Sequence, residues 1–112
     1  MHELGITRNI VAIVGEAAKG RRVSRVTVEI GKLSGVMTAA IAFCFEAVAK
    51  GTELDGATLD IRQIEGRARC LACGEEFAAE TLYTPCGCGS RRIVLLTGEE
   101  LNIKTMELEE TA

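Results

Sequence analysis

The chain has 112 residues, of which 47% are hydrophobic and 26% charged, and it carries a formal net charge of −3 with a pI near 5.2. This length and composition are typical of one globular domain with a small appendage, and they exclude a disordered chain. The acidic balance and the 4% of aromatic residues, with no Trp, argue against a nucleic-acid-binding surface, which needs basic and stacking side chains.

The first 30 residues predict a helix followed by a strand. Apolar residues recur at helical spacing over residues 6–18, and we expect Lys19-Gly20 to end this helix, because glycine adopts the left-handed cap conformation without steric cost. Residues 23–30 alternate between apolar and polar, which predicts a half-buried strand. The apolar side of this strand consists of Val26, Val28 and Ile30.

The middle of the chain repeats this order of helix and strand. After a turn region, residues 38–50 predict a second helix that ends at Gly51. Residues 57–64 alternate again and predict a second strand. We interpret Cys44, on the second helix, as a small buried hydrophobic residue. The expected core stripe of that helix consists of Ile41, Phe45, Val48 and Ala49.

The last part of the chain combines a cysteine-rich segment with two further strands. Residues 67–92 hold four of the five cysteines and show no sustained helical or strand period. Residues 93–108 predict a strand, a turn at Thr97-Gly98 and a final strand that returns to the first sheet. The order predicts an α/β (α+β) fold: a small sheet of about three strands packed with two helices, plus an inserted zinc-ribbon-like cysteine domain. We place the first domain at 1–66 and 93–112 and the cysteine domain at 67–92.

The sequence also favours a reducing cellular compartment. No apolar run reaches the roughly 18 residues of a membrane span. The first residues include Glu3 and no basic lead, so they do not form a secretory signal. We therefore expect a cytoplasmic protein with no membrane association, in which thiols stay reduced. Five cysteines in such a protein are interpreted as metal ligands or reactive groups before disulfides.

The cysteines are spaced as Cys70-x2-Cys73 and Cys86-x-Cys88, with twelve residues between the pairs. Two such pairs can close a tetrahedron of thiolates around Zn(II), and four protein ligands leave no open position for water, which is typical of a structural site. A tetrathiolate iron site stays open on spacing alone. A redox pair at Cys70 and Cys73 would lack its usual βαβ setting, and a nucleic-acid-binding zinc ribbon would lack positive charge.

His2 is the only histidine of the chain. A histidine at a chain end is usually a solvated residue without function. However, the amine of Met1, the amide nitrogen of His2 and its imidazole can form fused chelate rings around Ni(II) or Cu(II), which favour planar nitrogen donors. Glu3 places a carboxylate beside the same ion. This arrangement requires that Met1 is retained with a free amine.

The sequence resembles the hydrogenase nickel incorporation proteins, the HypA/HybF family of nickel metallochaperones, over essentially its whole length. The resemblance rests on MHEL at the start, VTVEIGKLSGV followed by AIAFCFEAV, the paired cysteines with CGS, and GEELNIKTMEL near the end. It implies one Ni(II) bound at the N-terminus through His2, with Glu3 and the amine of Met1. It also implies a structural Zn(II), whose ligands match Cys70, Cys73, Cys86 and Cys88.

The resemblance further implies a carrier and not an enzyme. Family members deliver nickel with a GTPase partner to the large subunit of a nickel–iron hydrogenase, and some relatives also serve urease. The residues agree with this interpretation, since one histidine cannot supply a Ser/His/Asp set and the chain has no P-loop for nucleotide hydrolysis. A monomer and a homodimer both stay open, the latter through the strands beside the insertion or a swapped element.

Two features depart from the family pattern. Many members have two residues between the second pair of cysteines, whereas this chain has only Gly87. The segment after LSGV often carries a Glu, whereas this chain has Thr38-Ala39-Ala40, so an additional oxygen ligand is missing there.

Two other functions compete with nickel transport. A zinc-ribbon interaction module of a transcription or translation complex would bind nucleic acid or ribosomes and would be indifferent to His2. A thiol redox protein would form a reversible disulfide between Cys70 and Cys73. The acidic charge and the MHE start weigh against both alternatives.

Overall fold

The computed structural model describes residues 2–110, which divide into two compact units. Of the described residues, the helical unit comprises 2–28, 37–62 and 102–110, and the cysteine unit comprises 29–36 and 63–101. In the described part of the chain, no helix is both long and apolar enough to cross a membrane.

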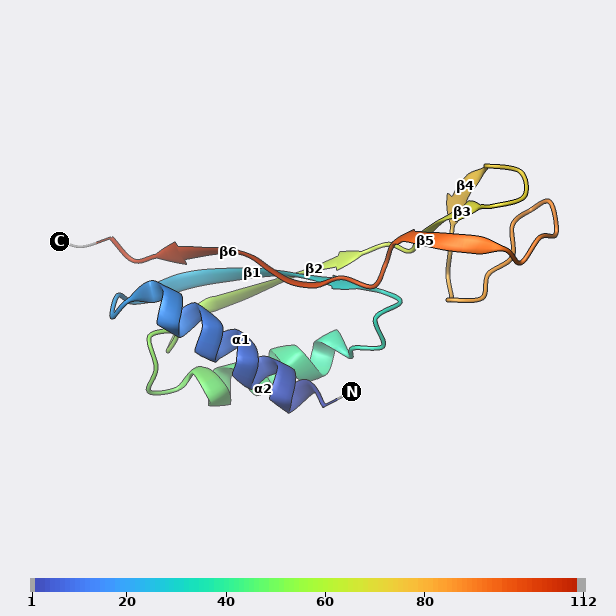
Figure 1. Ribbon diagram of the computed structural model, residues 1–112. Helices are drawn as coiled ribbons and strands as arrows, with labels where there is room; N and C mark the ends of the chain where they lie inside the picture. Colours follow the sequence, from blue (N-terminus) through green and yellow to red (C-terminus); the bar gives the residue numbers. More distant parts are fainter. Residues whose placement is uncertain (1, 111–112) are drawn as a thin grey trace. The chain divides into compact units, whose positions relative to one another are not determined.

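The first sheet has three strands in the order β2-β1-β6. The central strand β1 (Val23–Gly31) lies between β2 (Thr58–Ile64) and β6 (Leu101–Leu108). Helices α1 (Glu3–Ala18) and α2 (Thr38–Ala49) pack against each other and lie on the same side of this sheet (Figure 1). The predicted return of the last strand to the first sheet is confirmed.

Both helices have the predicted type, with small differences at their ends. Helix α1 begins at Glu3, three residues earlier than its apolar period. Lys19, and not only Gly20, takes the left-handed conformation at its end, with φ of 51°, and its N–H donates to the Glu16 carbonyl at 3.3 Å. In α2, Val48 is half-buried, while the rest of the predicted stripe is buried: Ile41, Phe45 and Ala49.

The two faces of the β2-β1-β6 sheet differ in chemistry. Toward the helices the helical unit buries a continuous apolar core, and an ion-pair network crosses the three strands on the opposite face. The Arg25 guanidinium lies 3.1 Å from the Glu107 carboxylate and 4.0 Å from Asp60. Such partly exposed pairs contribute about 0.2–1 kcal/mol each, so the core holds this unit together. The buried core residues of the helical unit include Val11, Val14, Val23, Val26, Val28, Ile41, Phe45 and Leu54.

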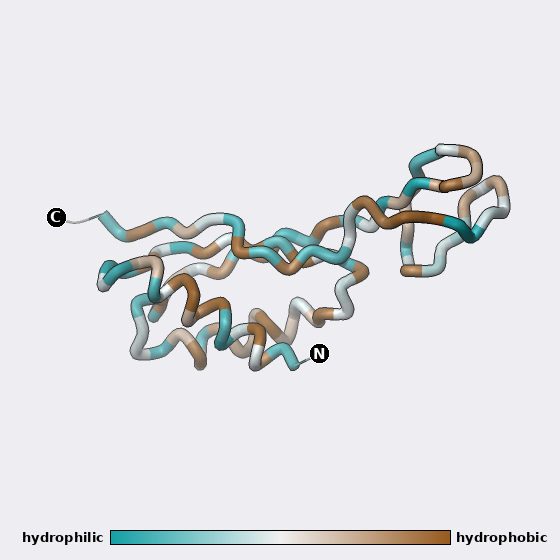
Figure 2. Tube along the Cα trace, viewed as in Figure 1, coloured by the Kyte–Doolittle hydropathy of each residue, from teal (hydrophilic) through white to brown (hydrophobic). Residues whose placement is uncertain are grey.

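The cysteine unit contains a second sheet, with strands in the order β4-β3-β5. Strand β3 (Arg67–Cys70) pairs antiparallel with both β4 (Glu76–Ala78) and β5 (Ile93–Thr97). Figure 2 shows β5 as a continuously hydrophobic strand. The segment 67–92 shows no strand period because β3 and β4 have only four and three residues. The domain boundaries expected at 67 and 92 stay a prediction, and the compact unit itself extends to residue 101.

Candidate metal centre

Four cysteine side chains of the cysteine unit converge on one point. Their Sγ atoms all lie within 4.8 Å of one another. The Cys70 and Cys88 sulfurs are 3.7 Å apart, and those of Cys73 and Cys86 are 3.6 Å apart. Sulfur ligands about 2.3 Å from a tetrahedral Zn(II) lie about 3.8 Å from one another. The cluster therefore fits one tetrahedral zinc ion.

Two similar backbone turns bring these sulfurs together. The Gly74 N–H donates to the Cys70 carbonyl at 2.9 Å, and the Gly89 N–H donates to the Cys86 carbonyl at 2.8 Å. Both glycines have positive φ, 82° for Gly74 and 92° for Gly89, a conformation that residues with a Cβ rarely adopt. Gly87, the single residue between Cys86 and Cys88, does not have positive φ. The shortened second pair thus turns at Gly89, and its sulfurs still reach the other pair.

The thiols of the cluster shift one another's pKa values. The Cys73 N–H donates to the Cys70 sulfur at 3.5 Å, and this bond is the main cause that lowers the pKa of Cys70 to about 6. A hydrogen bond from the Glu75 backbone favours the Cys73 thiolate, but the Cys86 side chain and burial outweigh it and raise the pKa of Cys73 to about 12. The Cys88 backbone favours the Cys86 thiolate, yet burial and the neighbouring thiols raise the pKa of Cys86. A divalent cation would allow all four groups to ionise together.

The N-terminal residues lie in the helical unit. His2 precedes the first turn of α1 in an extended conformation and is exposed, and its carbonyl accepts the Ile6 N–H at 3.1 Å. Within residues 2–110 its imidazole makes no hydrogen bond. Met1, the predicted amine ligand, lies outside the described residues. The imidazole is therefore available to a cation.

The Glu3 carboxylate accepts a hydrogen bond from a segment that the sequence analysis did not associate with it. Its Oε2 accepts the N–H of Met37, the residue that precedes α2, at 3.0 Å. This hydrogen bond is the main cause that holds the pKa of the Glu3 carboxyl below its usual value. The two residues are 34 positions apart in the sequence. A side chain that binds a backbone N–H places no requirement on the type of the partner residue, so the contact produces no recognisable sequence pattern. Sequence reasoning therefore could not have found Met37.

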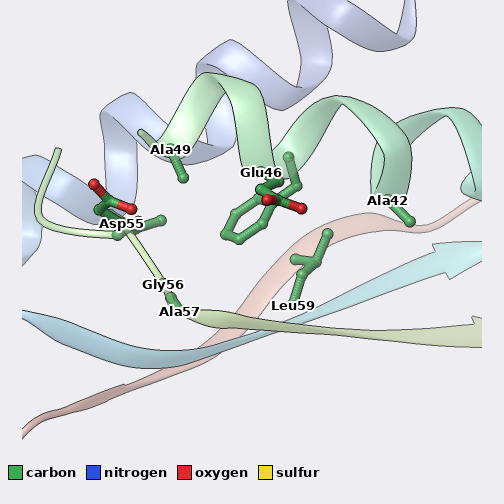
Figure 3. Close-up of a pocket in the computed structure, with 9 residues that line it drawn as sticks. Ala42, Glu46, Ala49, Asp55, Gly56, Ala57 and Leu59 are labelled. Carbon is green, nitrogen blue, oxygen red and sulfur yellow. The ribbon is translucent and has the colours of Figure 1, made fainter. Parts of the chain in front are cut away.

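The fifth cysteine and a surface hollow lie elsewhere in the helical unit. Cys44 is free and half-buried, so the predicted burial is only partial. A hollow of about 410 Å³ is lined by residues of α2, of β2 and of the segment between them. Figure 3 shows Glu46 and Asp55 among the side chains that line it. Asp55 Oδ2 accepts the Gly51 N–H at 3.0 Å. The hollow is lined by apolar residues, among them Phe45, Leu54 and Leu59, and by these two carboxylates.

Comparisons with known proteins agree along the whole chain. A family model described as hydrogenase/urease nickel incorporation, metallochaperone, hypA matches residues 1–108. The hydrogenase maturation factor HypA of Nostoc sp. is 56% identical over 110 residues, which cover 98% of this chain and 97% of that protein. The corresponding factor of Geobacter metallireducens is 47% identical, covering 97% and 100%.

Solved structures give the same result. A solution structure of HypA matches with a TM-score of 0.71 and 27% identity, covering 97% of both chains. The solution structure of the nickel metallochaperone HypA from Helicobacter pylori matches with a TM-score of 0.66 and 25% identity, covering 96% of this chain and 97% of that one. The fold, the four-cysteine cluster and the full-length similarity confirm the resemblance. This chain belongs to the HypA family of nickel-incorporation metallochaperones.

Proposed function

We propose that this protein is a cytoplasmic nickel carrier that binds one Ni(II) at its N-terminus and delivers it for maturation of a nickel–iron hydrogenase. On this proposal the protein acts with a GTPase partner, the hydrogenase large subunit receives the metal, and urease maturation factors are further partners. The protein is not an enzyme, because it transfers an ion without changing a covalent bond. Support comes from family membership and, above all, from the imidazole of His2 beside Glu3, which is exposed and makes no hydrogen bond to any described residue.

The position of His2 before α1 suits a site built from nitrogen donors. The first four N–H groups of a helix have no acceptor within the helix, and here the Ile6 N–H donates to the His2 carbonyl. Nickel can therefore take the amine of Met1 and the amide and imidazole nitrogens of His2 while α1 stays folded. The helix dipole disfavours a cation at this end by about 0.3–1 kcal/mol, and the carboxylate of Glu3 offsets this effect.

The proposed nitrogen ligands also provide a means of release. The amine, the amide and the imidazole must each give up a proton, or stay without one, to bind the metal. Nickel affinity should therefore fall as the pH falls. A carrier needs this property, since its cargo must leave.

The four-cysteine cluster is proposed as a structural Zn(II) site with Cys70, Cys73, Cys86 and Cys88 as ligands. The chemistry supports this assignment: four sulfur ligands complete the coordination of zinc and leave no position for a substrate. The bound ion would supply folding free energy and neutralise the thiolates. Its function would thus be to order the cysteine unit.

Calorimetric titration with Ni(II) tests the nickel site. The protein should be free of tags and zinc-loaded, with Met1 verified by intact mass. We expect one tight equivalent for the wild type and an affinity lower by about 100-fold or more for His2→Ala, because loss of an outer-shell partner alone costs 10–100-fold. Asn9→Ala, an exposed change on the same helix, should bind like the wild type. If His2→Ala binds nickel with the same affinity as the wild type, the proposed N-terminal nickel site is wrong.

Zinc content measured on the same preparations tests the second site. Cys88→Ala should lose zinc, while Cys44→Ala should retain one equivalent, because Cys44 lies outside the cluster. If His2→Ala keeps zinc and loses nickel, the two sites are distinct. Retention of zinc by Cys88→Ala, or a reversible Cys70–Cys73 disulfide in the wild type, would contradict the structural-zinc assignment.

A further inference from the structure

The β4-β3-β5 sheet has one covered face and one exposed face. The residues of β3 alternate between the two faces, with Ala68 buried and Arg69 exposed. The register pairs Ala68 with residues of β4 and β5 that are half-buried, whereas it pairs Arg69 with Glu76 and Val94, which are exposed. Successive side chains of a strand point to opposite faces. All three strands therefore agree on which side of this sheet is exposed.

The exposed face extends beyond the regular pairing at both ends. The Leu71 N–H donates to the Arg92 carbonyl at 2.8 Å, so the ladder between β3 and β5 continues for one more pair. At the other end the register shifts between Arg67 and Ala68, and Leu96 is the extra residue of β5 in this bulge. Leu71 is 56% exposed and Leu96 is 38% exposed. The exposed face, here called the arginine face, consists of Arg67, Arg69, Leu71, Arg92, Val94 and Leu96.

Most of the positive charge on the arginine face is not neutralised by the chain itself. Arg69 forms an ion pair with Glu76, at 3.3 Å. Within residues 2–110, no ion pair or hydrogen bond engages the guanidinium groups of Arg67 and Arg92. Two of the three arginines thus lack a carboxylate, although the chain as a whole carries a net charge of −3.

The other sheet of the protein treats its arginines differently. Arg22, Arg25 and Arg62, which lie in or beside the strands of the β2-β1-β6 sheet, each have a carboxylate within 4.0 Å. The arginine face combines two unpaired guanidinium groups with three exposed aliphatic side chains. Such a surface is complementary to a ligand that carries both carboxylates and aliphatic groups.

The positions of the unpaired arginines set the spacing of this ligand. Arg67 precedes Arg69 by two residues on β3, and Arg92 lies opposite Leu71, two residues further along. Four residues of a strand span about 13 Å at about 3.3 Å per residue. An extended polypeptide covers the same distance with carboxylates on its first and fifth residues. Its three intervening residues would then lie over the aliphatic side chains.

We propose that the arginine face binds an extended acidic segment of a partner protein, with one carboxylate at Arg67, one at Arg92 and aliphatic side chains over Val94. Nucleic acid matches this face less well, because the face has no aromatic side chain on which bases could stack. The contact is weak and sensitive to salt, since exposed ion pairs are screened. The face lies within the cysteine unit and nickel does not enter the contact, so its test is independent of the proposed function.

Titration of the isotope-labelled, zinc-loaded, full-length protein with short peptides, followed by NMR, tests the proposal. The acidic probe is Ac-Ser-Glu-Leu-Leu-Leu-Glu-Ser-NH2, and two matched peptides carry glutamine or lysine in place of both glutamates. We expect the acidic probe to shift the amide signals of Arg69, Leu71 and Val94. The glutamine peptide should bind about tenfold more weakly, because it lacks both ion pairs. The lysine peptide should not bind.

Single substitutions locate the contact. Arg67→Gln and Arg92→Gln should each raise the dissociation constant of the acidic probe by about threefold, because each removes one exposed ion pair. Val94→Thr keeps the shape of the side chain but replaces a methyl group by a hydroxyl, and should weaken binding by a similar factor. Arg91→Gln is the matched control. Arg91 is exposed, and the alternation of the strand directs it away from the arginine face, so the constant should stay unchanged.

The amide spectra also verify that each variant stays folded. An acidic probe that shifts no signal of the arginine face at millimolar concentration would overturn the proposal. Equal weakening by Arg91→Gln and Arg92→Gln would overturn it as well, because net charge and not the face would then determine binding. A single-stranded oligothymidylate that shifts the same signals at lower concentration than the acidic probe would assign the face to nucleic acid instead.

Discussion

The Glu3 carboxylate joins the first turn of α1 to the start of α2. Its Oε2 accepts the Met37 N–H, and the first turn of α2, Thr38-Ala39-Ala40, has no acidic residue of its own. Glu3 therefore supplies the negative charge that the N-terminus of α2 favours. A nickel ion that used this carboxylate would take Oε1 or compete with α2 for Oε2. Loss of Glu3 would then combine loss of a ligand with a structural change.

Urea unfolding of the zinc-loaded, nickel-free protein separates the two effects. We expect Glu3→Ala to be less stable than the wild type, with Glu3→Gln between them, because the amide oxygen still accepts the Met37 N–H but carries no charge. Since the pKa of Glu3 is lowered in the folded protein, the contact stabilises at neutral pH. Its contribution disappears as the pH falls through that lowered pKa.

Glu16→Gln provides the matched control for this experiment. Glu16 is exposed in the last turn of the same helix, where the helix dipole disfavours a negative charge, so its substitution should not lower the unfolding midpoint. If the Glu3→Ala variant unfolds at the same urea concentration as the wild type, Glu3 does not stabilise the N-terminus of α2. In that case any change in nickel affinity of Glu3→Gln would report the ligand role alone.

At the scale of elements, β1 ends where two backbone segments of the cysteine unit touch. The Gly31 N–H donates to the Glu100 carbonyl at 2.8 Å, and the Leu33 N–H donates to the Gly98 carbonyl at 2.7 Å. A Cβ on Gly31 would lie 1.9 Å from the Gly98 carbonyl oxygen. Neither segment can withdraw without breaking these hydrogen bonds. Glycine at position 31 is therefore required by the close approach.

We expect Gly31→Ala to lower the free energy of unfolding by about 3 kcal/mol or more, because the added methyl group meets backbone and not a flexible side chain. Gly87→Ala is the matched control, since a Cβ there has no atom within 4 Å and φ is not positive. Chemical unfolding of both zinc-loaded variants measures the difference. A Gly31→Ala protein as stable as Gly87→Ala would show that the two segments can separate at little cost.

The long elements were predictable because periodicity over many residues averages out local exceptions. Strand β1 buries the predicted face of Val26, Val28 and Ile30. Helix α1 forms where its apolar period predicts a helix, although Ile13 of that period is 58% exposed. The short strands β3 and β4 were not predictable, since three or four residues hold no period. Their pairing depends on the turn that brings Cys70 and Cys73 together. That turn is closed by the hydrogen bond from the Gly74 N–H to the Cys70 carbonyl, and Gly74, with its positive φ, is its only local signal.

The candidate sites differ in the same way. The spacing of the cysteine pairs predicts that four thiols cluster, and the structure brings their sulfurs together. Their role as zinc ligands stays a proposal. The contact of Glu3 with Met37 was hidden from sequence reasoning because it involves a backbone N–H distant along the chain. Residue types that carry chemistry can thus be found in sequence, whereas the backbone groups that orient them cannot.

At the scale of the whole molecule, the two units have cores of different strength. The helical unit buries large aliphatic and aromatic side chains, among them Ile41, Phe45 and Leu54. Apart from Ile30, the buried hydrophobic residues described in the cysteine unit are small: Ala68, Cys70, Ala79 and Cys86. Burial contributes about 25 cal/mol per Å² of apolar surface. The cysteine unit therefore has little apolar stabilisation and needs another source of folding free energy.

Removal of zinc by a chelator should unfold the cysteine unit and leave the helical unit folded. Structural zinc sites contribute on the order of 10 kcal/mol to folding, which is more than a core of alanines and cysteines can replace. Amide hydrogen exchange should show loss of protection at Ala68 and Cys70, with protection kept at Val26 and Ile41. The helical circular dichroism should persist, and added Zn(II) should restore the lost protection. If the helices instead unfold together with β3, the two units fold as one cooperative body. If protection at Cys70 survives removal of zinc, the thiol cluster is ordered without a metal.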